Sequence, residues 1–550
     1  MSSSKVEQVV GAKGSDVFDG TGNALVNLSA LLVRNGWTAK LESLFLEALE
    51  TAEDDAFVLA FQTRDIRGGK GERELFGKMV EVLLKKRPEL MLGLLDLVPE
   101  YGCWRDLYTE HFHGYRPDVS ALVVKQLKAD AASSDRPISL CAKWAPREGK
   151  DTEGAKALSA LLFPEEKSLS QRLKRYRHLV AGLNRKLDTT EIKMCDRHFA
   201  DIEPVKVPGV CLAKNMKAFL NKPVKGGGLR HPGDKDRMDC REHFQNHMSL
   251  AVAGCAKVNG AVTRYPHQVI KDIVSLCDTC PDGAERDALV AVWNGMVLNA
   301  KALGGLGRTI AMCDFSGSML SAGAAKDTPY WVSLAMGLLI SEVTSDEFRD
   351  MFMTFDSNPA WHNLPPSSDI FSRVTSIGNI GQGLSTDFQK AMDLVLATLK
   401  QRRVRPGQEP KDLIVITDMA WDMACASNQR SPYTDNSYRH IVKTAPWQTQ
   451  IQMIREAFRR AGEDMWGCPW TPPRIVIWNV AATCNDFHAT ADTEGVIMLS
   501  GWSPSLFKVL TAEGARIQTP LEALRIQLDD ERYRPVRERL AELRGADGQA

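Results

Sequence analysis

The sequence predicts a multi-domain α plus α/β protein, with an N-terminal α-helical repeat region (a solenoid or a ring) followed by a doubly wound α/β domain. Three observations lead to this fold class. A chain of 550 residues is longer than one hydrophobic core usually accommodates. Apolar residues follow helical spacing up to about residue 300, and short apolar runs alternate with helical patterns after residue 304. The composition, 44% hydrophobic and 25% charged, excludes collagen-like, coiled-coil and wholly disordered chains.

Helices dominate the first half of the predicted fold. One amphipathic face has apolar residues at the spacing i, i+3, i+4, i+7 and i+8, namely at Leu41, Leu44, Phe45, Ala48 and Leu49. A second helix covers residues 76–83 and ends before Pro88, and a further one runs from Pro88 to a break at Pro99–Gly102. Strand-like alternation is almost absent before residue 300. We therefore expect a helical-repeat domain over residues 20–300.

Strands and helices alternate in the second half. The predicted strands are the apolar runs Arg308–Cys313, Leu413–Thr417, Arg474–Trp478 and Gly495–Leu499. The predicted helices are Pro329–Val343, Asp387–Lys400, Thr449–Ala461 and Pro504–Leu510. Continuous apolar strands that alternate with helices indicate a parallel sheet covered on both faces. We expect this domain to span residues 305–515.

Three segments are predicted to lie outside that sheet. Asn358–Pro366, which contains His362, is interpreted as irregular structure. Asp422–Trp447 is interpreted as a surface insertion because it is rich in Ser, Asn, Tyr and Pro. Residues 516–550 form a charged C-terminal tail, which we expect to be helical with a solvated outer face.

Oxygen-bearing side chains follow the predicted strands. Asp314, Ser316 and Ser318 come directly after the first strand, and Asp418 directly follows the second. Thr386 lies in a glycine-rich loop, 381–387, that opens a helix. Folds of this kind bind ligands at the carboxyl ends of their strands, and hard divalent cations prefer oxygen ligands. The pattern predicts a cation site. The alternative is that Ser316 or Ser318 only caps the following helix.

This set of residues resembles the metal-ion-dependent adhesion site (MIDAS) of von Willebrand factor A domains, which are doubly wound and Rossmann-like. The resemblance implies that Ser316, Ser318 and Thr386 bind Mg²⁺ or Mn²⁺ directly, although Ser385 could replace Thr386. It implies that Asp314 and Asp418 act mainly through bound waters. The open coordination position would take an acidic group from a partner.

A basic segment within the helical half is a candidate RNA-binding surface. Residues 167–230 contain 15 Lys or Arg residues against 5 Asp or Glu residues, and such a cluster suits phosphate binding. Tyr176, His178 and Phe219 are interleaved with it and could stack on unpaired bases. The alternative is a solvated helix face with inward aromatics, and charge alone leaves both open. The RNA-binding candidates are Lys174, Arg175, Arg177, Arg185, Lys186, Lys214 and Lys217.

A glycine-rich basic loop, Arg64–Arg73, lacks the spacing of a nucleotide-binding P-loop and is interpreted as a helix–helix joint. Together with Tyr101–Leu107 and the following α/β domain, it resembles the TROVE module of Ro ribonucleoproteins. The likeness is closer to a family of uncharacterised Ro-related proteins, on the stretches Ala142–Pro146, Tyr176–Val180, Ile475–Asn479 and Leu499–Trp502. It implies a ring of helical repeats closed by an A-type domain. It also implies non-catalytic binding of small noncoding or misfolded RNA.

Several function classes are excluded at this stage. The first residues contain no apolar stretch suited to a signal peptide, and Tyr330–Val343 is too short to span a bilayer. Twelve cysteines without a secretion signal indicate a cytoplasmic protein. The sequence has no Walker loop, zinc-ligand set or recognisable nucleophile–base pair, so we expect no enzyme activity. We expect RNA binding and no membrane partner. The alternative is a metal-dependent protein–protein scaffold that grips an acidic residue of its partner.

Overall fold

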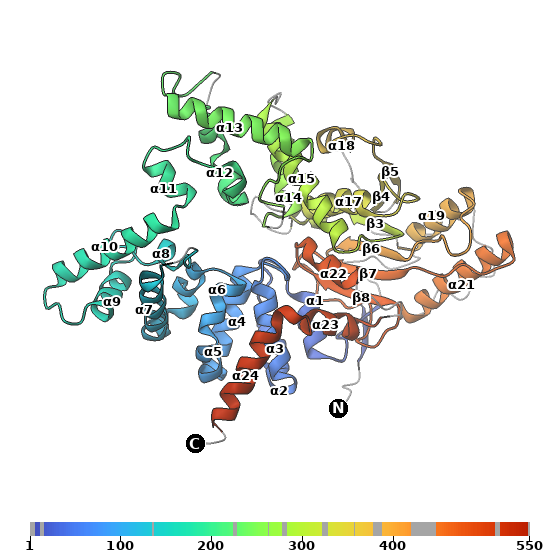
Figure 1. Cartoon of the computed structure of the whole chain (residues 1–550). Coiled ribbons are helices and arrows are strands. Elements are labelled where there is room, and N and C mark those ends of the chain that lie inside the picture. The colour runs from blue at the N-terminus through green and yellow to red at the C-terminus, as the bar shows by residue number, and fades with distance from the viewer. Residues whose placement is uncertain are drawn as a thin grey trace. The chain divides into compact units, whose positions relative to one another are not determined.

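The computed structural model (Figure 1) describes residues 6–10, 16–134, 137–223, 228–261, 263–277, 283–321, 328–356, 358–377, 388–419, 447–511 and 518–547. The chain divides into two compact units. We call Met1–Leu59, Arg264–Asp282 and Val292–Asp530 the sheet unit. We call Ala60–Thr263, Gly283–Ala291 and Glu531–Ala550 the helical unit. Within the described residues, every helix is too short or too polar to cross a bilayer.

A six-stranded sheet forms the centre of the sheet unit, in the order β5-β4-β3-β6-β7-β8. Its strands are β3 (Thr309–Asp314), β4 (Met351–Phe355), β5 (Trp361–Asn363), β6 (Asp412–Thr417), β7 (Arg474–Asn479) and β8 (Val496–Ser500). β5 pairs antiparallel with β4, whereas all the other pairs are parallel. Every residue of β3 and β6 is buried. The expected α plus α/β class is confirmed, with the sheet mixed at one edge.

β4 and β5 were not among the predicted strands. His362 was placed in irregular structure, and that prediction is wrong because it lies on β5 and stacks on Phe352. β5 has only three residues, none of them buried, so it lacks the apolar run by which the other strands are recognised. Burial in this stack lowers the pKa of His362.

The helices of the sheet unit are α1 (Ala24–Leu31), α2 (Ala39–Thr51), α14 (Pro266–Cys277), α16 (Gly317–Ser321), α17 (Pro329–Val343), α18 (Ile370–Ile377), α19 (Phe388–Gln401), α21 (Trp447–Trp466), α22 (Lys508–Thr511) and α23 (Pro520–Leu528). A 3₁₀ helix, η6 (Pro504–Phe507), precedes α22. α17 is buried almost throughout and packs on β3, β4 and α14. The helices predicted between the strands are therefore confirmed, within a few residues at their ends.

The N-terminal segment belongs to the sheet unit through long-range contacts. A hairpin of β1 (Gln8–Val10) and β2 (Asp16–Phe18), not predicted from the sequence, is joined to the unit by the Phe18 amide, which donates to the Phe487 carbonyl at 2.8 Å. Asn479, at the end of β7, donates to the Ala30 carbonyl at 2.9 Å. Ser500, at the end of β8, donates to the Ser29 carbonyl at 2.5 Å. The open carbonyls at the end of α1 thus find partners on the sheet.

The helical unit consists of successive helices, as its periodicity predicts, and their lengths range from one turn to the 19 residues of α10. They are α4 (Arg73–Lys86), α5 (Pro88–Gly93), α6 (Val98–Tyr101), α7 (Arg116–Ala132), α8 (Cys141–Trp144), α9 (Thr152–Leu162), α10 (Leu169–Leu187), α11 (Thr190–Cys195), α12 (Gly209–Phe219), α13 (Lys235–Val252) and α24 (Arg534–Asp547). The 3₁₀ helices are η1 (Leu95–Leu97), η2 (Trp104–Tyr108), η3 (Glu110–Tyr115), η4 (Pro204–Lys206) and η7 (Glu531–Tyr533). α3 (Glu53–Arg64) and α15 (Ala284–Ala302) contribute to both units.

The C-terminal tail is helical as expected, and one of its faces is packed on the helical unit. Tyr533, Val536 and Leu540 are buried. Asp65, which is fully buried, accepts hydrogen bonds from Arg532 and from the Tyr533 hydroxyl at 3.1 Å. The remaining faces of α24 carry its exposed charges. Asp65 therefore anchors the end of the chain.

We predict that Asp65→Ala detaches α24 locally. The substitution leaves Arg532 and two backbone amides of the 64–73 loop without their carboxylate acceptor, at a cost of about 2 kcal/mol. Hydrogen exchange of residues 534–547 should therefore become at least about ten-fold faster. Asp96→Ala, which removes only the exposed pair with Arg539, is the matched control and should change exchange little. Equal exchange in the two variants would show that Asp65 is not the anchor.

Candidate metal centre and candidate RNA-binding surface

Two fully buried carboxylates lie at the carboxyl ends of neighbouring strands. Asp314 ends β3, and Asp418 directly follows β6. β3 and β6 run side by side in the sheet (Figure 1) and are parallel, with Cys313 opposite Ile416. Asp314 and Asp418 therefore both come to lie at the same edge of the sheet. Each has an exposed fraction of 0%. Two like charges are thus placed close together where water does not reach them.

The electrostatics of Asp314 reflect this position. Burial and, after it, the negative charge of Asp418 raise the pKa of Asp314 to about 7. Hydrogen bonds from Ser316 and Thr417 act in the opposite direction. Within the described residues, Asp314 accepts hydrogen bonds from these neutral donors and pairs with no lysine or arginine. A carboxylate in such a setting is stabilised by a cation or by a proton.

The turn after β3 gathers three of the predicted ligands. The Ser316 amide donates to Asp314 Oδ1 at 2.8 Å. The hydroxyls of Ser316 and Ser318 lie 3.1 Å apart, at the start of α16. Ser316 is fully buried, and Ser318 is partly exposed. The donor set is therefore carboxylate and hydroxyl oxygen, which fits a hard dication such as Mg²⁺ or Mn²⁺. Thr386 and Ser385 lie outside the described residues.

Two threonines complete the surroundings of the carboxylates and were not predicted. Thr417 Oγ1 donates to Asp314 Oδ2 at 2.9 Å, and Thr483 Oγ1 donates to Asp418 Oδ2 at 3.2 Å. The sequence does indicate Thr417 as a site residue, because it is the last residue of the predicted strand and directly precedes Asp418. The sequence gives no such indication for Thr483, because this residue follows another strand and lies 65 positions from Asp418.

A buried histidine lies behind this edge. Nε2 of His488 lies 2.9 Å from the Met419 carbonyl, next to Asp418 in sequence. Burial lowers the pKa of His488 to about 4. The imidazole is therefore neutral near pH 7, and it helps to position the backbone that follows β6.

The predicted RNA-binding residues fall into two groups. Three have partners within the helical unit: Arg175 pairs with Glu165 at 2.5 Å, Arg177 pairs with Glu148 at 2.6 Å, and Lys186 donates to the Ser133 carbonyl. The other four are exposed, and their side chains form no hydrogen bond or ion pair with any residue that the structure describes. These unpaired cations are Lys174, Arg185, Lys214 and Lys217. The positive charge open to a ligand is smaller than the composition suggests.

Two of the three aromatic side chains proposed for base stacking are in the core, so that part of the prediction is wrong. Tyr176 is 2% exposed and donates to the Pro146 carbonyl at 2.7 Å. Phe219 is fully buried and stacks on Phe244, with 4.5 Å between the ring centroids. His178 alone is exposed. Both buried residues lie on the apolar stripes of their helices.

The glycine-rich loop is a helix–helix joint, as predicted. Asp106, on η2, binds Arg64 Nε at 2.6 Å and Arg73 Nε at 2.6 Å. The loop and the Tyr101–Leu107 stretch are thereby joined in one ion network, in which Arg64 and Asp106 are buried and Arg73 is exposed. Lys70 is also buried, and burial lowers its pKa to about 7. These side chains hold the joint together and do not form an open phosphate site.

The chain is similar to two protein families and to several individual proteins. Residues 116–306 match a family described as "Domain of unknown function (DUF2828)", and residues 308–542 match one described as "Domain of unknown function (DUF7788)". "Uncharacterized protein L728" of Acanthamoeba polyphaga mimivirus is 26% identical over 531 residues, which cover 91% of this chain and 84% of that protein.

Among solved structures, the chain is similar to the Ro (RSR) protein of Deinococcus radiodurans. The superposition has a TM-score of 0.38 at 15% sequence identity and covers 89% of this chain and 99% of that chain.

Proposed function

We propose that this chain is a non-catalytic RNA-binding protein of the Ro ribonucleoprotein type. It would bind small noncoding or misfolded RNA through a basic surface on α10 and α12. The observation that carries the proposal is the group of four exposed cations, Lys174, Arg185, Lys214 and Lys217, without partners in the described part of the chain. Unpaired cations bind phosphates without first giving up an ion pair.

The spacing of these residues suits a polyanion. Lys174, His178 and Arg185 are 4 and 7 positions apart on α10, which places them on one helix face over about 16 Å. Lys214 and Lys217 are three positions apart on α12 and also share a face. The sequence resemblance to Ro proteins supports RNA over other polyanions.

The proposal includes a divalent cation in the sheet unit. Ser316, Ser318 and Thr386 would hold Mg²⁺ or Mn²⁺, with Asp314 and Asp418 acting mainly through waters. When bound, the cation supplies positive charge that offsets the two buried carboxylates and a coordination position for an acidic group. Hydroxyls and carboxylates are ligands of a hard cation, and they do not form a nucleophile–base pair, so the proposed activity is binding.

A second candidate function is metal-dependent adhesion to a protein partner. Leu320 favours it, because this large apolar side chain is 55% exposed two positions after Ser318 on α16. An acidic partner residue on the cation would bring neighbouring apolar surface against Leu320. Adhesion to a protein partner would require the metal ion, whereas RNA binding through α10 and α12 would not require it.

We predict that the double variant Lys174→Glu/Arg185→Glu binds a labelled structured RNA at least about ten-fold more weakly than the unchanged chain. The plot of log affinity against log salt concentration should be shallower by about two, one for each lost phosphate contact. Fluorescence anisotropy over a series of salt concentrations measures both quantities. Lys156→Glu/Lys206→Glu is the control, since it makes the same charge change at two lysines that already pair with neighbouring glutamates. Equal weakening by the two double variants would point to net charge instead of this surface.

We predict that Mg²⁺ raises the thermal unfolding midpoint of the chain by several degrees, because a ligand at 100 times its Kd stabilises by about 2.7 kcal/mol. EDTA should reverse the increase. Asp314→Asn should remove it, whereas Ser372→Ala, at an exposed serine elsewhere in the sheet unit, should keep it. An unchanged response to Mg²⁺ in Asp314→Asn would exclude the proposed site. RNA binding that survives EDTA would separate the RNA function from the metal.

A further inference from the structure

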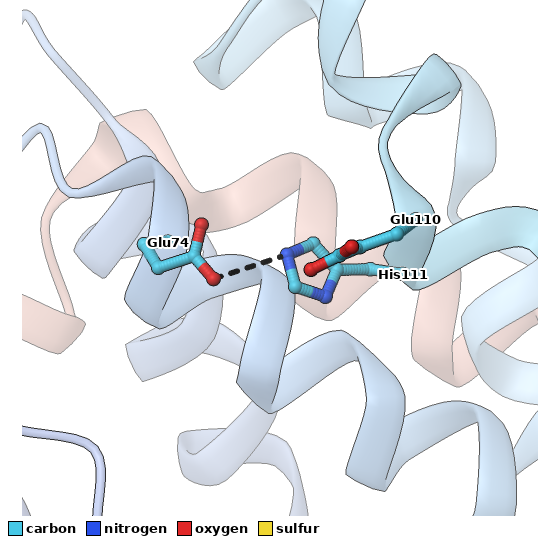
Figure 2. A group of neighbouring side chains, drawn as sticks. All are labelled: Glu74, Glu110 and His111. Carbon is cyan, nitrogen blue, oxygen red and sulfur yellow. Dashed lines mark ion pairs between the residues drawn. The ribbon is translucent and has the colours of Figure 1, made fainter.

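Three side chains of the helical unit converge at a second place where a metal ion can bind. Glu74 lies on α4, and Glu110 and His111 lie on η3, which packs against α4. Figure 2 shows the two carboxylates directed toward the imidazole. One ligand atom from each residue lies within 4.8 Å of the others. Glu74 Oε1 lies 3.6 Å from His111 Nε2, which is longer than a hydrogen bond.

The imidazole is held in one orientation. Nδ1 of His111 lies 2.6 Å from Glu81 Oε1, and the side chain is only 3% exposed. Nε2 forms no hydrogen bond with the residues that the structure describes, and Glu74 Oε1 lies on its side of the ring. A carboxylate on the far nitrogen is the usual outer partner of a metal-binding histidine, because it fixes the ring and makes the ligating nitrogen more basic.

The His111 ring packs closely against the backbone of α4 at Gly77. A Cβ added at Gly77 would lie 2.1 Å from Cδ2 of His111, so no larger residue fits without moving the ring. Glycine within a helix costs about 1 kcal/mol relative to alanine. Gly77 is the helix residue against which the His111 ring packs, so the close contact requires glycine there despite this cost.

The two segments that carry the ligands are also fixed to each other. Asp106 binds Arg73, which precedes Glu74, and it lies four positions before Glu110. It also binds Arg64, and the side chains of this second pair are both buried. The ligand-bearing ends of α4 and η3 are therefore held together before any ion arrives, which is the arrangement that a metal site requires.

The charge of the group is unbalanced. Three carboxylates, from Glu74, Glu81 and Glu110, surround one imidazole, and Lys78 is paired with Glu81 at 3.2 Å.

We propose that a borderline dication of the Zn²⁺ class binds His111 Nε2 together with Glu74 and Glu110. Imidazole with carboxylate oxygens suits Zn²⁺ better than Mg²⁺. Three protein ligands leave a position for water or another ligand, and the Glu74 side chain, 66% exposed, leaves the site accessible.

The experiment is isothermal titration of the full chain with Zn²⁺ in excess Mg²⁺, so that the proposed site of the sheet unit is occupied. We expect one tight equivalent. Glu74→Gln and Glu110→Gln, both at exposed positions, should weaken it at least about ten-fold without affecting folding. Glu81→Gln should weaken it about 10- to 100-fold through the outer carboxylate. Glu89→Gln, on an exposed glutamate of α5, and Asp314→Asn should leave it unchanged.

Three results would overturn the proposal. The first is the absence of a tight equivalent, which would leave the group as a histidine held between Glu81 and Glu74 without a metal. The second is binding that Glu74→Gln and Glu110→Gln leave unchanged, which would assign the ion to other groups such as the exposed thiols of Cys195, Cys255 and Cys468. Loss of the tight equivalent in Asp314→Asn alone would assign it to the sheet unit.

Discussion

The pairing of β3 with β6 brings two carboxylates together in the interior of the sheet unit. Because the strands are parallel and in register, Asp314 and Asp418 meet at one edge, and each is fully buried. Hydroxyls of Ser316, Thr417 and Thr483 surround them. Burying like charges is costly unless a counter-charge is present. A bound cation removes that cost, and the proposed metal-dependent properties of the chain depend on it.

The sequence contains enough information to place this edge but not to describe its surroundings. Continuous apolar runs that end at Asp314 and Asp418 predict two buried parallel strands, and the structure has both. β5 is too short and too exposed to show such a run. The contacts of Asn479 and Ser500 with the carbonyls of α1 join residues more than 440 positions apart. No local pattern predicts contacts at that separation.

The basic segment shows why composition overstates a binding surface. Arg175 and Arg177 are neutralised by Glu165 and Glu148, which lie 10 and 29 positions away, and a charge count cannot pair them. The burial of Tyr176 does have a signal in the sequence, since Tyr176, Val180 and Leu183 are spaced as one helix face and are all buried. Helical periodicity therefore separates the buried Tyr176 from the exposed His178, whereas charge alone does not.

Anomalous diffraction from crystals soaked in Mn²⁺ tests the central interaction most directly, because it locates the ion without relying on stability or affinity. We expect one strong peak at about 2.0–2.3 Å from the hydroxyl oxygens of Ser316 and Ser318, with Asp314 and Asp418 on its far side. A well-ordered edge with no Mn²⁺ peak beside these serines, at saturating ion, would contradict it. The two buried carboxylates would then be stabilised by a shared proton instead of a metal.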